Sequence, residues 1–266
     1  MLGSGGVVPA SDDDRALIDA ARAGDRAAID ELLASYEPAI YRFGLRMCGD
    51  EESAREVLQE TMLAAFQHLP GFRGDASLST WLYQIARSFC IKERRGQRPM
   101  AGLDERVADS APTPDRQVHA REIGVALAKA ITALPAEQRE VLVLRDVEGL
   151  SADEAAQVIG IEVGALKSRL HRARMALREA LVGVLDARAT EPCRELAHEL
   201  TAYAGAEIDQ ATCAQIETHL SGCVRCAGAC DALKRTVSMC RSIPGGTVPS
   251  PVRAAVRAAI LDAISR

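Results

Sequence analysis

Apolar residues recur every three or four positions through much of this chain, and this spacing restricts it to packed helices. One stripe runs through Ile29, Leu32 and Tyr36, and similar stripes run along Val57–Phe66 and Trp81–Phe89. Residues at this spacing share one face of a helix, which can be buried against a neighbouring helix. Hydrophobic residues make up 48% of the chain and aromatic residues only 3%, so the cores must be built from Ala, Leu, Val and Ile. We predict an all-α fold.

The chain divides into segments of different composition. Its 266 residues exceed what one compact helical core needs, which favours two or three small domains. The stretch from Gly96 to Asp115 holds three prolines and two glycines, as is typical of a linker. The predicted segments are a disordered lead at 1–13, a helical bundle at 14–98, a linker at 99–120, a helix-turn-helix domain at 121–187, a Cys- and His-rich domain at 190–243 and an amphipathic helix at 251–266.

Two short helices joined by a tight turn are predicted after the linker. Ser151 can cap the first helix, with Glu154 completing a capping box, and Gly160 can end it after about two turns. Between Val163 and Arg178 the second helix has five basic residues and no acid. It can therefore lie in a DNA major groove, although the formal net charge of the chain is −5. A solvated basic face is the alternative.

Four segments carry a family resemblance. Asp50–Thr61 resembles the polymerase-binding segment of extracytoplasmic-function (ECF) sigma factors, and Phe72–Arg87 resembles the part that reads the −10 promoter element. Leu134–Arg139 and Lys167–Arg174 are similar to the C-terminal domain of the same family, which reads the −35 element. The resemblance covers about residues 15–185. It implies a non-enzymatic transcription initiation factor whose partners are RNA polymerase core and promoter DNA.

The resemblance also implies which side chains contact each partner. Leu58, Met62 and Phe66 are expected to form an apolar strip that docks on the polymerase, with burial inside the bundle as the alternative. The implied polymerase-binding residues are Asp50, Glu51, Leu58, Gln59, Glu60, Met62 and Phe66. The implied DNA-binding residues are Trp81, Arg87, Lys92, Arg94, Arg95, Lys167, Ser168, Arg169, His171, Arg172 and Arg174.

Some of these DNA-binding assignments have plain alternatives. Trp81, the only tryptophan, can hold an extruded base or can be a core residue. Arg94 and Arg95 suit phosphate contacts, or simply a solvated helix end. Ser88 and Lys92 stand where the family often has Asn and Asp, which predicts an unusual promoter preference.

The last third of the chain has the spacing of a metal site. His219 and Cys223 are four residues apart, and Cys223 and Cys226 are three apart, which brings their side chains together across a helical turn or a helix start. With Cys193 from a preceding helix they supply one His and three Cys for one tetrahedral zinc ion, structural or sensory. The segment also resembles a zinc-binding anti-sigma domain.

The other five cysteines receive no ligand role. Cys213, Cys230 and Cys240 can be packed thiols, or one of them can enter the zinc shell or form a disulfide when zinc leaves. Cys48 and Cys90 each sit alone in helical, apolar surroundings. Each is therefore expected to be a buried, inert thiol.

The preferred function is promoter-directed transcription initiation, regulated in cis by contact between the C-terminal domain and the sigma domains. The C-terminal helix has a stripe that suits docking on another helix, with a solvated end helix as the alternative. This stripe consists of Val252, Val256, Ile260 and Ile264. One rival is a metal- or redox-sensing DNA-binding regulator that acts without polymerase. A weaker rival, a thiol oxidoreductase using Cys223 and Cys226, lacks the alternating strand and helix pattern of its usual fold.

The location of the protein follows from what its sequence lacks. No uncharged apolar run reaches the ~18 residues that a membrane span requires, and no basic region followed by an apolar stretch opens the chain. We therefore predict a cytoplasmic protein without membrane contact. Its eight cysteines then indicate metal or redox chemistry rather than a disulfide scaffold.

Overall fold

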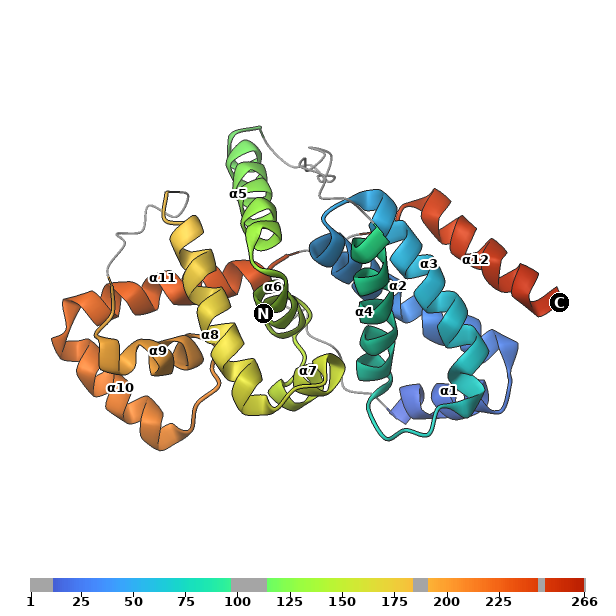
Figure 1. The fold of residues 1–266 in the computed structure, drawn as a ribbon, viewed down its shortest axis with the longest axis horizontal. Coiled ribbons are helices and arrows are strands. Elements are labelled where there is room, and N and C mark those ends of the chain that lie inside the picture. Colours follow the sequence, from blue (N-terminus) through green and yellow to red (C-terminus); the bar gives the residue numbers. More distant parts are fainter. Residues whose placement is uncertain (1–11, 97–113, 184–190, 244–246, 266) are drawn as a thin grey trace. The chain divides into compact units, whose positions relative to one another are not determined.

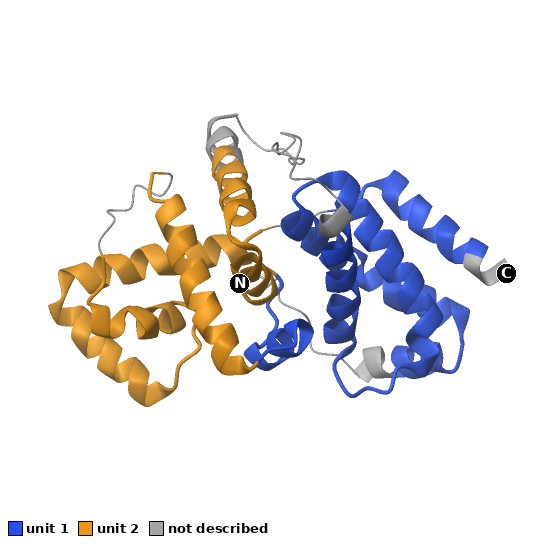
Figure 2. Cartoon of the chain, viewed as in Figure 1, with its two compact units in different colours: residues 1–103, 148–161, 244–266 blue, residues 104–147, 162–243 orange. Residues whose placement is uncertain are grey.

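The computed structural model describes residues 12–96, 114–183, 191–243 and 247–265. Every regular element in these ranges is helical (Figure 1), which confirms the all-α prediction. Contacts divide the chain into two compact units (Figure 2). Unit 1 comprises residues 1–103, 148–161 and 244–266, and unit 2 comprises residues 104–147 and 162–243.

Unit 1 is built around a bundle of helices from the N-terminal part of the chain. These are α1 (Asp12–Arg22), α2 (Arg26–Cys48), α3 (Glu51–His68) and α4 (Leu78–Gly96), with the short η1 (Leu69–Gly71) after α3. Leu32, Ile40 and Leu82 are fully buried where the apolar faces meet. The rings of Phe43 and Tyr83 pack edge to face with their centroids 5.4 Å apart. This is the bundle that the helical spacing predicts.

Side-chain caps fix where α3 and α7 (Ala152–Ile159) begin. The carboxylate of Asp50 accepts the backbone N–H of Ser53 at 2.8 Å. Ser151 and Glu154 form the predicted capping box at the start of α7. Gly160 ends α7 with a φ of +79°, a left-handed conformation that glycine adopts without steric cost. The predicted helix boundaries at these positions are confirmed.

Two later segments complete unit 1. Helix α7 packs on α4, and α12 (Ser250–Ser265) packs along α3. The hydroxyl of Ser77 donates a hydrogen bond to the Glu154 carboxylate at 3.2 Å, and the amide of Gln84 donates to the carbonyl of Gln157 at 3.1 Å. Residues about 70 positions apart in sequence thus lie side by side at the edge of the bundle.

A buried ion pair precedes α7. The side chain of Glu148 is completely buried, and it accepts hydrogen bonds from Arg42 Nε at 2.8 Å and from the Tyr83 hydroxyl at 2.8 Å. Burial raises the pKa of Glu148, and the nearby Arg42 guanidinium opposes this effect only in part. The carboxylate therefore ties the segment before α7 to α2 and α4.

Unit 2 combines the remaining helices around α8. In chain order these are α5 (Pro114–Ala133), α6 (Ala136–Leu142), η2 (Val143–Val147), α8 (Val163–Ala180), η3 (Arg194–Leu196), α9 (Ala197–Ala204), α10 (Gln210–Gly222) and α11 (Val224–Arg241). Leu200, Ile216 and Leu233 form a core with two buried cysteines, and Met175 of α8 packs against it. Helix α8 and the C-terminal helices therefore share a core, although they were predicted as separate segments at 121–187 and 190–243.

Two predicted boundaries differ from the structure. Helix α5 begins at Pro114, inside the predicted linker at 99–120, because proline is well suited to the first turn of a helix. Helix α1 begins at Asp12, inside the predicted lead at 1–13. The rest of the lead, and residues 97–113 of the linker region, lie outside the described residues.

Candidate functional site

The basic helix α8 presents only part of its predicted DNA-binding set to solvent. Lys167, Ser168 and Arg172 are exposed. Arg169 is half-buried, and its guanidinium lies 3.5 Å from the carboxylate of Glu137 on α6. On the packed face, Leu166, Leu170 and Leu177 are buried, while Val163 is half-buried. The helix thus has the amphipathic character expected, with three predicted contacts free to face outward.

Arg174 was predicted to contact DNA, but its side chain is 1% exposed. The guanidinium donates two hydrogen bonds to Asp146, at 2.6 and 2.8 Å, and one to the carbonyl oxygen of Thr201 at 2.8 Å. It also lies 2.9 Å from the carboxylate of Glu207. Burial lowers the pKa of Arg174, but the carboxylates of Asp146 and Glu207 more than offset this and raise it overall. Arg174 is therefore a buried, permanently charged anchor in this conformation.

His171 is also engaged by the C-terminal helices. Its Nδ1 lies 3.0 Å from the hydroxyl of Thr201, and its ring centroid lies 5.0 Å from that of His198. Burial, followed by the neighbouring His198, lowers the pKa of His171. A cavity of about 340 Å³, lined by α8 and residues 198–209, opens beside this pair. His171 is thus half-buried and faces α9.

The predicted polymerase-binding residues on α3 divide in the same way. Leu58 and Met62 have no solvent exposure, so these two residues of the expected apolar strip are buried, as its alternative anticipated. Glu51 and Glu60 are exposed, while Gln59 and Phe66 are half-buried. Asp50 caps α3, so its carboxylate is already occupied by the Ser53 backbone and hydroxyl.

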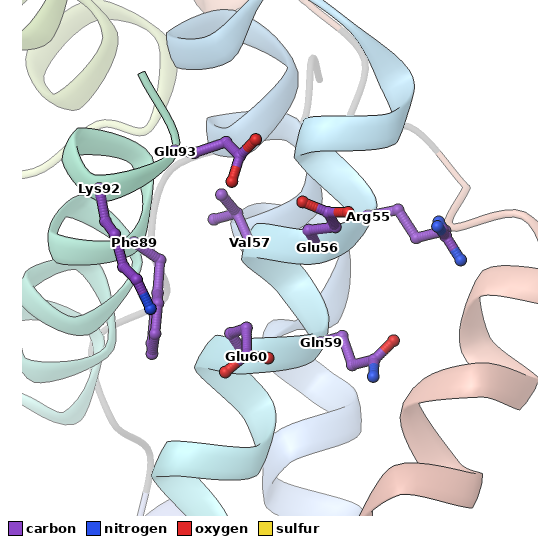
Figure 3. A pocket seen from close by; sticks show the side chains of 8 residues that line it. All are labelled: Arg55, Glu56, Val57, Gln59, Glu60, Phe89, Lys92 and Glu93. Atoms are coloured by element: carbon purple, nitrogen blue, oxygen red, sulfur yellow. The ribbon is translucent and has the colours of Figure 1, made fainter. Parts of the chain in front are cut away.

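A pocket of about 440 Å³ opens between α3 and α4, where the predicted polymerase-binding and promoter-reading helices meet (Figure 3). Gln59, Glu60 and Lys92 from the predicted sets line it, together with residues that the resemblance did not single out. These are Arg55, Glu56, Val57, Phe89 and Glu93. Burial and the nearby Glu93 raise the pKa of Glu56. Glu56 and Glu60 are four residues apart, and this spacing in the sequence indicates that both carboxylates lie on the same face of α3.

The remaining residues of the predicted promoter reader lie along α4. Trp81 is half-buried, and its ring packs on Phe72 with centroids 5.3 Å apart. Arg87 is half-buried and Lys92 is exposed. Arg94 and Arg95 belong to the last turns of α4, but their side chains lie outside the described residues. Trp81 is therefore neither fully exposed nor a core residue.

Helix α12 covers part of the α3 surface. Val252, Val256 and Ile260 of its predicted stripe are buried, and α12 packs against α3. The Nε of Arg253 lies 3.1 Å from the carboxylate of Glu37 on α2. In Figure 3, Arg55 and Gln59 project from α3 towards the pale red ribbon of α12. The predicted docking of the C-terminal helix on another helical surface is thus present within unit 1.

The four predicted metal ligands meet at one place in unit 2. The ligand atoms of Cys193, His219, Cys223 and Cys226 all lie within 4.8 Å of one another. Cys193 precedes η3, His219 lies on α10, and the other two cysteines lie at the start of α11. The Nε2 atom of His219 is buried and has no hydrogen-bond partner among the described residues. A buried imidazole nitrogen facing three thiols fits a tetrahedral zinc ion with one His and three Cys ligands.

The pKa values of Cys193 and Cys223 are shifted in opposite directions. The backbone N–H of Cys226 lowers the pKa of Cys223 to about 7. A hydrogen bond with the Cys226 thiol raises the pKa of Cys193 to about 11. The backbone N–H of Cys193 in turn lies 3.2 Å from the Cys226 sulfur, a contact that would support a thiolate ligand. Because zinc binds thiolates, this arrangement begins with one ligand partly ionised near neutral pH.

The other C-terminal cysteines lie outside the group of converging ligands. Cys230 and Cys240 are buried, and Cys230 belongs to the core of the C-terminal helices. Cys213 is half-buried, and its thiol lies 3.5 Å from the Glu217 carboxylate. Among the described residues, none of the three belongs to the group of converging ligands.

The comparisons with known proteins agree with the sigma-factor resemblance. Among the described residues, no helix has the length and apolar character needed to cross a bilayer. Residues 32–99 match the family Sigma-70 region 2, and residues 124–177 match Sigma-70, region 4. A solved structure of CnrH in complex with the cytosolic domain of CnrY is similar over 67% of this chain and 100% of that chain, with a TM-score of 0.51 and 28% identity.

Curated relatives give the same result. The RNA polymerase sigma-H factor of Pseudomonas aeruginosa is 33% identical, over 65% of this chain and 95% of that protein. The ECF sigma factor SigW of Bacillus subtilis is 31% identical, over 59% of this chain and 91% of that protein. SigE of Mycolicibacterium smegmatis is 33% identical, and the match spans 64% of its length. On these matches the chain belongs to the ECF RNA polymerase sigma factors of the sigma-70 family.

Proposed function

We propose that this protein directs RNA polymerase core to specific promoters and that its C-terminal segment restrains this activity in cis. The observation that carries the regulatory part is the buried position of Arg174 on α8, held between Asp146 and the C-terminal residues Thr201 and Glu207. An arginine of the promoter-reading helix cannot contact phosphates while its guanidinium is fully bonded inside the protein.

The C-terminal helices restrain only part of α8. Lys167, Ser168 and Arg172 stay exposed, so this helix retains cations for a first encounter with DNA. His171 and Arg174 instead belong to the contact with α9. We therefore infer that full promoter engagement requires α9 to leave α8.

The second restraint acts on the polymerase-binding helix. Helix α12 packs along α3, which contains most of the predicted polymerase contacts. A polymerase surface that used the Gln59 side of α3 would have to displace α12 first (Figure 3). The solved complex of CnrH with the cytosolic domain of CnrY offers a parallel in which a second polypeptide accompanies a similar protein.

Zinc would hold the restraining segment together. Cys193, His219, Cys223 and Cys226 come from the start of η3, from α10 and from α11, so one closed tetrahedral site would fasten all three to each other. Zinc in such a site supplies structural binding energy and no reactive coordination position. Loss of the metal should loosen the helices that contact α8.

Transcription in vitro with core polymerase tests this proposal on the full chain. Val256→Asp places a charge where a buried side chain packs and should release α12, raising promoter-specific transcription several-fold. The matched control is Leu261→Asp on the same helix, because Leu261 is 63% exposed and this variant should transcribe as the parent does.

Two results would count against the proposal. If proteolysis shows that α12 of Val256→Asp is released while transcription stays at the parental level, the restraint by α12 is refuted. If the protein binds promoter DNA but neither it nor its variants bind core polymerase, the sigma activity itself is refuted. The rival regulator that acts without polymerase would then be favoured.

A further inference from the structure

Two cysteines of unit 1 face each other. The Sγ atoms of Cys48 and Cys90 lie 3.3 Å apart, although the residues are 42 positions apart in sequence. Cys48 is the last residue of α2, and Cys90 lies in the second half of α4. Cys90 is 1% exposed, whereas Cys48 is half-buried. Cys90 is buried as expected, whereas Cys48 is only half-buried, and the two thiols are direct neighbours.

The geometry of this pair is close to that of a disulfide. A disulfide bond is about 2.05 Å long, so the two sulfurs would have to approach by little more than about 1 Å. Gly49 follows Cys48 with a φ of +95°, so the backbone leaves the helix immediately after this cysteine. The closing movement can thus occur at the end of α2 without disturbing the helix before it.

We propose that Cys48 and Cys90 are a redox-active dithiol that forms a reversible disulfide between α2 and α4. With a peroxide as the oxidant, the thiolate of Cys48 attacks one peroxide oxygen and becomes a sulfenic acid while hydroxide leaves. The sulfur of Cys90 then attacks the sulfenic sulfur, and its proton leaves with the departing oxygen as water. Two thiols and one hydrogen peroxide give one disulfide and two waters, and a small dithiol reverses the reaction.

The unequal exposure of the two cysteines indicates which sulfur reacts first with the oxidant. The half-buried Cys48 can meet an oxidant, while the buried Cys90 is reached only by Cys48. The bond would close a loop that contains all of α3 and would fix the part of α4 that carries Arg87 and Lys92. This pair lies in unit 1, whereas the four converging metal ligands lie in unit 2. The proposal therefore stands or fails independently of the zinc site.

Peptide mapping of the full-length, zinc-loaded protein tests the proposal. After peroxide treatment and alkylation, trypsin should yield the peptide Met47–Arg55 joined to Ser88–Lys92, each of which contains one cysteine. A thiol count after unfolding in a chelator should fall by two of the eight cysteines as long as a colorimetric assay detects no released zinc. The thermal midpoint of unit 1 should rise by on the order of 10 °C and return when a reductant is added.

Matched variants make each outcome decisive. Cys48→Ser and Cys90→Ser should each lose the joined peptide and the thermal shift, while Cys213→Ser should keep both. The proposal is overturned if Cys48 and Cys90 remain separately alkylatable at peroxide levels that already oxidise the zinc-binding cysteines. It is also overturned if Cys48→Ser shows the same thermal shift as the parent.

Discussion

Asp146 and Glu148 are two residues apart, yet each neutralises an arginine in a different unit. Asp146 pairs with Arg174 in unit 2, and Glu148 pairs with Arg42 in unit 1. The Arg174 cluster adds a second carboxylate, Glu207, which also pairs with Arg145, so two carboxylates face two guanidinium groups. The Glu148 cluster has one carboxylate and a neutral Tyr83 hydroxyl. The first cluster depends on the C-terminal helices, whereas the second is complete within unit 1.

Removing zinc should give the largest difference in response between the Arg174 cluster and the Arg42–Glu148 pair. The double variant with Cys223→Ser and Cys226→Ser should lose its metal and much of the helicity of residues 193–240, because such sites supply roughly 10 kcal/mol of folding free energy. Glu207 and Thr201 would then leave Arg174, while the Arg42 and Glu148 pair remains. Metal analysis, circular dichroism and transcription in vitro measure this, and we expect transcription to rise.

Val224→Ser is the control for the zinc variant, because Val224 lies beside Cys223 and is 88% exposed. It should retain both zinc and parental transcription. A double variant that is free of zinc but transcribes at the parental rate would mean that the C-terminal segment is a passive appendage.

Removal of the arginines should come next in size. Arg174→Ala leaves Asp146 buried with no cation, and breaking a buried pair in this way costs about 3–5 kcal/mol. Arg42→Ala should cost less, because Glu148 already has a raised pKa and can take up a proton. Urea denaturation of both variants measures the difference, with the exposed Arg172→Ala expected within about 0.5 kcal/mol of the parent. Equal costs for Arg42 and Arg174 would remove the contrast.

The pH dependence of Glu148 should give a smaller effect. Its pKa is raised in the folded protein, so the folded state favours the protonated form. The stability from this group is fully present below the ordinary pKa near 4.5 and is lost as the pH rises through the raised value. Relative to Glu148→Gln, the parent should therefore lose unfolding free energy as the pH increases from about 4.5 towards neutrality. Urea titrations of unit 1 at several pH values check the sign.

Loss of the exposed cations on α8 should give the smallest effect on the protein itself. Lys167→Ala and Arg172→Ala should leave stability unchanged, but each should weaken promoter binding and reduce the slope of log affinity against log salt by about one. Arg235→Ala on α11, which also removes an exposed cation, should leave that slope unchanged. An unaltered slope for both α8 variants would contradict the placement of this helix on DNA.

Local signals account for what the sequence could predict. The capping box of Ser151 and Glu154, the left-handed Gly160 and the convergence of His219, Cys223 and Cys226 all depend on residues within about two helical turns. The roles of Arg174 and Leu58 depend on partners far along the chain. Glu207 lies 33 positions from Arg174, and no helical periodicity links the two.

The sequence does contain an indication of one unpredicted partner of Arg174, namely Asp146. The stretch from Leu142 to Val147 is apolar except for Arg145 and Asp146. An acid in a buried stretch requires a cation, but the sequence does not say which. Similarly, the helical spacing placed Cys48 and Cys90 on separate helices, and only the packing of α2 against α4 brings the two sulfurs together.

The carboxylate of Glu154 serves two helices, since it completes the cap of α7 and accepts a hydrogen bond from Ser77 near the start of α4. Substitution at position 154 is therefore constrained by both hydrogen bonds. A change to Asp shortens the side chain by one methylene and would fail at both contacts together, whereas Gln keeps the reach that both require. In an alignment of descendants of this chain, position 154 should vary between Glu and Gln, and changes at Ser77 should accompany the rare exceptions.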